Sequence, residues 1–290
     1  MELIQEPIKG NSTLKSTAVI VLLLAGLTAL EIIAPFKQAA YAHTFTGDES
    51  ASFLSIIKIM QAEADLVQSN LVSNLTMAQD HAKAVVAVLN GNHTFGVLPD
   101  EVSEKNERLA TNLGNAANSL QAVVMSEPGP TQADVKMRVD NLNASLKEAV
   151  AVRVPKDHLS NFTVNGEVTR NLVNETLRQY GNALGNSGGI GENASALANS
   201  DAAPSQNSVV NMSAYQSAQA LASQVQGMVT QTKSLIPANT TSPITFTIAK
   251  VVNDLSQLKN IIDTKSPYSN AADLIEKILY PNLDATFHLK

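Results

Sequence analysis

The sequence predicts an all-α protein built as an up-and-down bundle of helices. Apolar residues recur at the three-to-four-residue spacing of a helix in successive segments from about residue 50 to residue 280. Aromatic residues make up only 4% of the chain and Trp is absent, which favours helices packed through aliphatic side chains over sheets. Most of the segments between the apolar stripes are short, as is typical of antiparallel neighbours in a bundle.

Four apolar stripes precede residue 155, and most are bounded by helix start or stop signals. They cover residues 53–71, 77–89, 102–123 and 135–150. Asp48 and Glu49 supply a favourable start for the first helix, and Thr131 caps the fourth. Asn90-Gly91 ends the second helix, and the Glu-Pro-Gly-Pro stretch at 127–130 ends the third.

The second half of the chain contains a segment without helical periodicity. After a turn region at 155–164 and a fifth stripe at 168–184, residues 185–208 are rich in Gly, Ser, Asn and Ala. Further stripes cover 212–236, 244–262 and 271–279, the last ended by Pro281. We expect two helical subdomains, 43–184 and 209–290, joined by a flexible linker at 185–208. The alternative is one larger bundle with that segment as a surface loop.

The N-terminus predicts export. Residues 17–36 form a run of about 20 mostly apolar residues, and Ala40-Tyr41-Ala42 matches the small-x-small pattern of a signal-peptidase site. Residues 1–42 are therefore expected to be a signal peptide, with His43 as the first mature residue. The alternative is an uncleaved anchor through residues 17–36, which Glu31 disfavours. Both interpretations place the remaining chain outside the cell, secreted or anchored by one helix.

Composition excludes several classes of partner and site. The formal net charge is −6 and no run of Lys or Arg occurs, so a nucleic-acid footprint is missing. No cysteine is present, which excludes disulfides, thiolate metal sites and cysteine nucleophiles. The mature region carries Asn-x-Ser/Thr sequons, which predict a glycosylated exterior. These candidate glycosylation sites are Asn74, Asn92, Asn143, Asn161, Asn174, Asn193, Asn211 and Asn239.

Two segments carry a resemblance. Residues 42–54, AHTFTGDESASFL, and residues 210–222, VNMSAYQSAQALA, resemble uncharacterised exported proteins of ammonia-oxidising archaea. The resemblance covers most of the mature chain in its layout, although neither segment is a motif of known chemistry. It implies an archaeal cell-surface setting with a copper-dependent metabolism nearby, and it implies no activity and no site residues.

The candidate metal site rests on His43. A mature N-terminal His offers its α-amino nitrogen and its Nδ1 as a chelating pair for Cu²⁺, which also needs a further imidazole or carboxylate. His81, on the apolar face of the second helix, is the preferred additional ligand. Other candidates are Glu63, Asp65 and His93, the last inside a sequon. Alternatively, any residue can follow a signal site, and His81 can be an ordinary core histidine.

Catalytic motifs are missing from the sequence. There is no G-x-S-x-G motif, and Gly188-Gly189-Ile190-Gly191 lacks the strand and Lys of a phosphate loop. We therefore expect a non-enzymatic, glycosylated cell-surface helical protein that acts by binding or structural association, its partner an unknown envelope protein or surface component. The alternative is an extracytoplasmic copper-binding or copper-delivery protein that uses His43.

Overall fold

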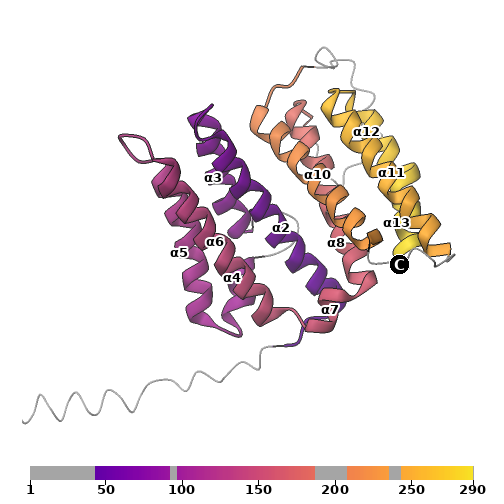
Figure 1. The fold of residues 1–290 in the computed structure, drawn as a ribbon, viewed down its shortest axis with the longest axis horizontal. Helices are drawn as coiled ribbons and strands as arrows, with labels where there is room; N and C mark the ends of the chain where they lie inside the picture. Colours follow the sequence, from indigo (N-terminus) through magenta and orange to yellow (C-terminus); the bar gives the residue numbers. More distant parts are fainter. Residues whose placement is uncertain (1–42, 92–96, 187–207, 235–242, 290) are drawn as a thin grey trace, which may run out of the picture. The chain divides into compact units, whose positions relative to one another are not determined.

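The structure is a computed structural model that describes residues 43–91, 97–186, 208–234 and 243–289. These residues contain helices and connecting turns with no β-strand, and successive helices run up and down the bundle (Figure 1). The predicted fold class is thereby confirmed. The predicted signal or anchor segment 1–42 and most of the segment 185–208 lie outside the described residues.

The helices form in the order that the apolar stripes predict, with some additional short elements. Those before residue 155 are α2 (Gly47–Asn70), α3 (Leu75–Leu89), α4 (Leu98–Ser103), α5 (Glu107–Val124) and α6 (Gln132–Arg153). Those after it are α7 (Lys156–Ser160), α8 (Phe162–Ala183), α10 (Met212–Ser234), α11 (Pro243–Asp263), α12 (Tyr268–Leu274), the π-helical turn η2 (Ile275–Leu279) and α13 (Tyr280–Phe287).

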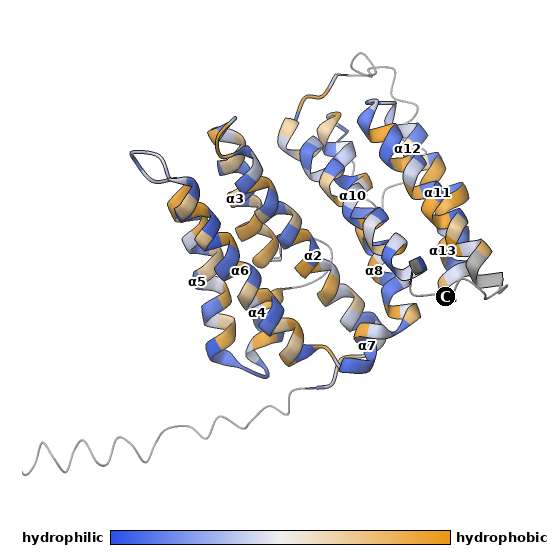
Figure 2. Cartoon of the chain, viewed as in Figure 1, coloured by the Kyte–Doolittle hydropathy of each residue, from blue (hydrophilic) through white to orange (hydrophobic). Residues whose placement is uncertain are grey.

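Helix α2 lies at the centre of the packing, because it contacts α3, α6, α8 and α10. Its inward face buries Ile56, Met60 and Val67. Helix α10 packs against α8 and α11 as well as against α2, so helices on either side of the segment 187–207 share one core. Buried apolar residues of these helices form one core cluster, and Figure 2 shows apolar and polar residues alternating along each helix.

Polar side chains cap the starts of most long helices. Thr46 caps α2 in a capping box with Glu49, so the predicted acidic residues occupy the first turn while Thr46 is the cap itself. Thr131 caps α6 as predicted, since its hydroxyl accepts a hydrogen bond from the Asp134 amide. Asn90 ends α3, and Gly91 follows with a φ of 82°, a left-handed conformation that glycine adopts freely.

Three predicted boundaries differ from the structure. The stripe at 102–123 belongs to two helices, because Asn106 caps a new helix by accepting a hydrogen bond from the Leu109 amide. The predicted turn at 155–164 contains α7 and the first residues of α8. Pro281 does not end the last helix, because it lies at the start of α13, directly after the π-helical turn η2 that continues into that helix.

Among the described helices, none is both long and apolar enough to cross a bilayer. The apolar run 17–36, on which the predicted anchor depends, lies outside the part of the chain that this search covers.

Two helical glycines predict opposite effects of the same substitution. A Cβ at Gly166 in α8 would lie 2.3 Å from Cβ of Phe287, whereas a Cβ at Gly114 in α5 would meet no atom within 4 Å. Gly166→Ala is expected to lower the free energy of unfolding by about 1–3 kcal/mol through overpacking. Gly114→Ala should raise it by about 0.5–1 kcal/mol, because alanine is the better helix former. Urea denaturation of both variants tests this, and equal signs would contradict the close approach of α13 to α8.

Candidate ligand-binding site

A buried polar network joins α2, α3 and α10. The carboxylate of Glu63 in α2 accepts hydrogen bonds from Nδ1 of His81 at 2.7 Å and from the Ser217 hydroxyl at 2.6 Å. Nε2 of His81 lies 2.9 Å from Oε1 of Gln216. Glu63 and His81 are each only 1% exposed, so this ion pair is among the most buried polar groups in the described chain.

The orientation of one amide determines the protonation of His81. Nδ2 of Asn70 donates to the Leu66 carbonyl at 2.9 Å and to Oε1 of Gln216 at the same distance. Nε2 of Gln216 donates back to Oδ1 of Asn70. The atom of Gln216 that faces His81 is therefore the oxygen, which accepts hydrogen bonds only. Both ring nitrogens of His81 thus face acceptors, an arrangement that favours the protonated imidazolium.

The environment of His81 shifts its pKa upward. Burial alone would lower the pKa, but the hydrogen bond to Glu63, the charge of Glu63 and the hydrogen bond to Gln216 outweigh it. The pKa of His81 is therefore raised above the ordinary value of an imidazole. The direction agrees with the acceptor geometry around both ring nitrogens.

This raised pKa predicts that stability falls at alkaline pH. The folded state holds the His81 proton more tightly than the unfolded state, so the stabilisation is complete below about pH 6.5. It is lost as the pH rises through the folded pKa. Urea denaturation of the full chain between pH 6 and pH 9 should show a decreasing free energy of unfolding, and His81→Gln should remove this component of the slope. An equal slope in both proteins would contradict it.

A second ion pair, between a buried carboxylate and a partly exposed guanidinium, lies on the neighbouring helix. Glu175 of α8 is 2% exposed and accepts two hydrogen bonds from the Arg178 guanidinium, at 2.7 and 2.5 Å. Nε2 of Gln179 donates to the same carboxylate at 2.8 Å. The hydrogen bonds to Glu175, together with the charges of Glu175 and Glu63, raise the pKa of Arg178 above its already high value. Glu63, His81, Glu175 and Arg178 thus form a group without net charge.

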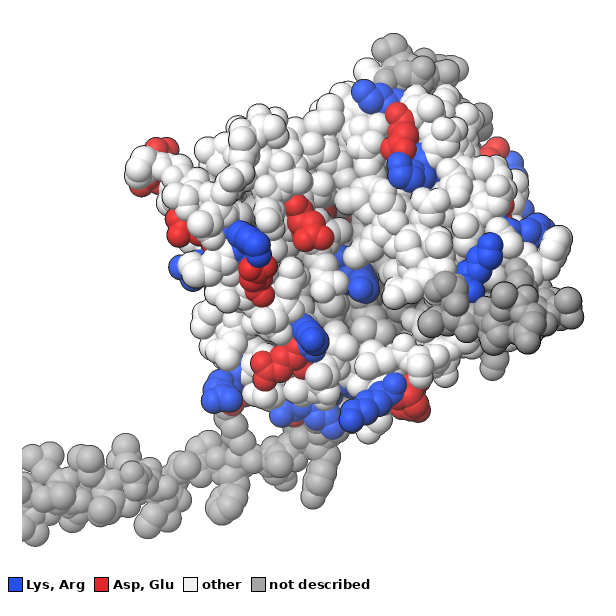
Figure 3. All heavy atoms as spheres, in the orientation of Figure 1, with Lys and Arg blue, Asp and Glu red and all other residues white. Residues whose placement is uncertain are grey.

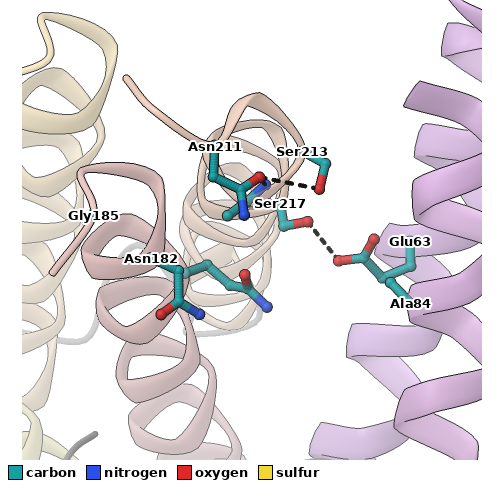
Figure 4. A pocket seen from close by; sticks show the side chains of 9 residues that line it. Glu63, Ala84, Asn182, Gly185, Asn211, Ser213 and Ser217 are labelled. Atoms are coloured by element: carbon teal, nitrogen blue, oxygen red, sulfur yellow. Dashed lines mark hydrogen bonds between the residues drawn. The ribbon is translucent and has the colours of Figure 1, made fainter. Parts of the chain in front are cut away.

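The Glu63 carboxylate also borders a pocket of about 330 Å³. Figure 4 shows the Ser217 hydroxyl directed at Glu63 across the space between α10 and α2, with Asn182 and Asn211 on the side of α8 and the start of α10. The lining combines amides, hydroxyls and small residues. It consists of Glu63, Ala84, Gln179, Asn182, Gly185, Asn211, Ser213, Ala214 and Ser217.

This arrangement does not assemble a catalytic triad. Nucleophilic catalysis by a serine needs a base that is hydrogen-bonded to its hydroxyl. The hydroxyl of Ser217 donates to Glu63, and both nitrogens of His81 are engaged by Glu63 and Gln216. The network can hold and orient hydrogen-bonding groups at the pocket.

The predicted metal ligand His43 lies in a separate cluster at the start of the described chain. Its Nδ1 is 3.1 Å from Glu104, and its Nε2 is 3.2 Å from Glu49. Arg153 donates to the carbonyl of His43, and its guanidinium is paired with Glu101 and Glu104. His43, Glu101 and Glu104 each offer a ligand atom, all within 4.8 Å of one another.

The structure pairs the predicted metal-ligand candidates differently from the expected combination. His43 and His81 have separate hydrogen-bond partners, and Glu63 is bonded to His81. Asp65 is exposed on α2, and His93 lies outside the described residues. Gln216 and Ser217 were not identified from the sequence. In the sequence these two polar residues stand between Tyr215 and Ala218 and interrupt the apolar stripe, which is the signal that could have indicated them.

The predicted glycosylation sites fall into three groups. Asn74, Asn161 and Asn211 are exposed, and each side-chain oxygen accepts the hydrogen bond that starts a helix. Asn143 and Asn174 lie within α6 and α8 and are partly buried. Asn92, Asn193 and Asn239 lie outside the described residues.

The chain was compared with protein-family models, curated proteins and solved structures, and none of them matches it.

Proposed function

We propose that this chain is an exported, glycosylated cell-surface protein that acts by binding, with the pocket between α2, α8 and α10 as its binding site. The observation that carries the proposal is the buried Glu63–His81 pair at the pocket, whose hydrogen bonds are satisfied and whose charges are balanced. Such a network orients acceptor groups toward the pocket without supplying a nucleophile or a free base.

The surface of the described domain is compatible with a site of this kind. On the face shown in Figure 3, most Lys and Arg side chains lie next to Asp or Glu, and no broad patch of one sign is present among the described residues of that face. Ion pairs such as Lys136–Asp140 and Lys83–Asp80 show the same local pairing of opposite charges. On this face, long-range attraction to a highly charged polymer therefore contributes little, and recognition depends on local contacts.

Export is supported by the position at which the helical domain begins. The compact unit starts at His43, the residue that cleavage after Ala42 would leave at the N-terminus. Mass spectrometry of the N-terminal peptide of the protein isolated from its own cells tests this directly. A free His43 would support export with cleavage, and an intact residue 1 found in the cytoplasmic fraction would contradict export.

The structure also predicts which sequons carry glycans. We expect glycosylation at Asn74, where the next two residues are exposed as well. We expect none at Asn174, which accepts a hydrogen bond from Tyr280 and whose sequon Thr176 is 0% exposed. Glycopeptide mass spectrometry measures the occupancy of both sites. Occupancy at Asn174 above that at Asn74 would show that modification precedes folding or that α8 is not formed as described.

Binding in the pocket is tested by native mass spectrometry of the full chain isolated from its own cells. We expect a retained small molecule in the wild type and none in Ala84→Leu, which fills the pocket wall from α3. Ala87→Leu is the matched control, because Ala87 lies on the same helix with similar exposure but does not line the pocket. Retention in all three proteins would place the molecule elsewhere, and retention in none would remove the support for this binding site.

Copper binding or delivery is the second candidate function, favoured by the cluster around His43. An imidazole and two carboxylates are ligands that Cu²⁺ accepts, and a free α-amine would add a further nitrogen. Arg153 already pairs with both carboxylates, so copper would have to bind beside that cation. His43→Ala and Glu104→Gln should then each weaken the binding of Cu²⁺ by the processed protein, as measured by titration. A titration that responds to His81→Ala instead would point to the buried histidine.

A further inference from the structure

We infer that the pocket at Glu63 binds an uncharged molecule of about the size of a monosaccharide that is rich in O–H or N–H donors. The inference rests on the proposed binding function and specifies the ligand of that site. A volume of about 330 Å³ corresponds to on the order of ten water molecules, and hence to a ligand of on the order of ten non-hydrogen atoms.

The charge balance of the pocket favours a neutral ligand. Glu63 is the one ionisable residue in the lining, and the imidazolium of His81 neutralises it from behind. The next charged groups, Glu175 and Arg178, also neutralise each other. A charged ligand would lose its hydration without meeting an uncompensated opposite charge, and this loss costs several kcal/mol. An uncharged ligand avoids that cost.

The hydrogen-bonding pattern of the lining favours a ligand rich in donors. Both oxygens of Glu63 accept hydrogen bonds and have further lone pairs, although only 1% of the residue is exposed at the pocket wall. The hydroxyl protons of Ser217 and Ser213 are given to Glu63 and Asn211, which leaves the lone pairs of both serine oxygens as acceptors in the lining. Nε2 of Gln179 is engaged by Glu175, which leaves its carbonyl oxygen as an acceptor too.

Donors in the lining come from the two asparagines. The oxygen of Asn211 accepts hydrogen bonds from the Ala214 amide and the Ser213 hydroxyl, so its NH₂ group points away from them. The amide of Asn182 offers one donor group and one acceptor. A ligand with several hydroxyls and one carbonyl, such as an N-acetylated sugar, matches this combination of many acceptors and few donors. Purely apolar ligands do not, because they would leave the amide groups of Asn182 and Asn211 at the pocket without hydrogen-bond partners.

The same nitrogen of Asn211 would carry a glycan if this sequon were used. A glycan attached there would start at the wall of the pocket and compete with a ligand. Binding is therefore measured on full-length chain produced without N-glycosylation, so that the pocket residues alone determine the result.

Three sugars of similar size and different charge test the inference. N-acetylglucosamine is uncharged, glucosamine carries an ammonium group, and glucuronate carries a carboxylate. We expect N-acetylglucosamine at millimolar concentration to raise the thermal midpoint of the wild type and of Ala87→Leu by a few degrees, and to leave Ala84→Leu unchanged. In calorimetry, the association constant of each charged sugar should be at most a tenth of that of N-acetylglucosamine.

Each other outcome overturns the inference. Stronger binding of glucosamine or glucuronate would show that the pocket selects a charged ligand. In a further outcome, none of the three sugars binds, but the wild-type protein still retains a small molecule that Ala84→Leu does not. This outcome would refute the ligand class and leave the binding function intact. No binding in either experiment would refute both. Circular dichroism of the two leucine variants confirms that each is folded.

Discussion

Replacing Glu63 by Leu is expected to lower the free energy of unfolding by about 3–5 kcal/mol, the range found when one partner of a buried ion pair is removed. The substitution keeps the approximate size of the side chain but leaves the His81 imidazolium without a counter-charge. His81 could then lose its proton and still donate from Nε2 to Gln216, but Nδ1 of His81 and the Ser217 hydroxyl would face an apolar side chain. Either state contains a buried polar group without a partner. Urea denaturation at pH 6 measures the loss.

An exposed ion pair provides the control for this prediction. Lys136 and Asp140 lie 2.6 Å apart on α6, but both side chains are 59% exposed. Asp140→Asn should therefore cost less than about 1 kcal/mol. A cost for Glu63→Leu as small as that for Asp140→Asn would contradict a buried, charged Glu63–His81 pair. The double variant with His81→Leu should cost clearly less than the sum of the two single substitutions, because both remove the same interaction.

The sequence predicts the helices of this fold well because each helix buries one apolar face. The stripe that contains Ile56, Met60 and Val67 forms the inner face of α2, as its periodicity indicates. The boundaries were predicted less well, because the same residue can continue or start a helix. Asn106 interrupts the third stripe by capping α5, and Pro281 occupies a first turn rather than a helix end. These choices depend on tertiary contacts that a local pattern does not contain.

The candidate site was only partly predictable. The sequence singles out His81 on the apolar face of the second helix, and Glu63 and Asp65 on the first helix, as candidate metal ligands. The pairing of His81 with Glu63, however, depends on the approach of α2 to α3, and the role of Gln216 depends on α10, 135 residues further along the chain. Sequence periodicity assigns each side chain to a face but does not say which faces meet. The charge balance that underlies our ligand inference follows only from those long-range contacts.

Replacing Phe287 by Ala is the second substitution with a large expected effect, a loss of about 3–5 kcal/mol in the free energy of unfolding. Phe287 is 1% exposed, and its ring packs against that of Phe162 with 4.6 Å between ring centroids. The backbone carbonyl of Phe287 also accepts a hydrogen bond from Thr163. Truncation leaves a cavity between α13 and the start of α8, which the glycine at 166 cannot fill.

Phe246→Ala is the matched control, because the side chain of Phe246 in α11 is 72% exposed. Its expected effect is within about 0.5 kcal/mol, the usual range for an exposed position. Hydrogen exchange adds a local measurement to the urea denaturation of both variants. Phe287→Ala should increase exchange most strongly in α13 and in the first turns of α8, since these are the segments that the aromatic pair holds together. Similar losses for the two phenylalanines, or unchanged exchange in α13, would show that the C-terminal helix is not anchored through this contact.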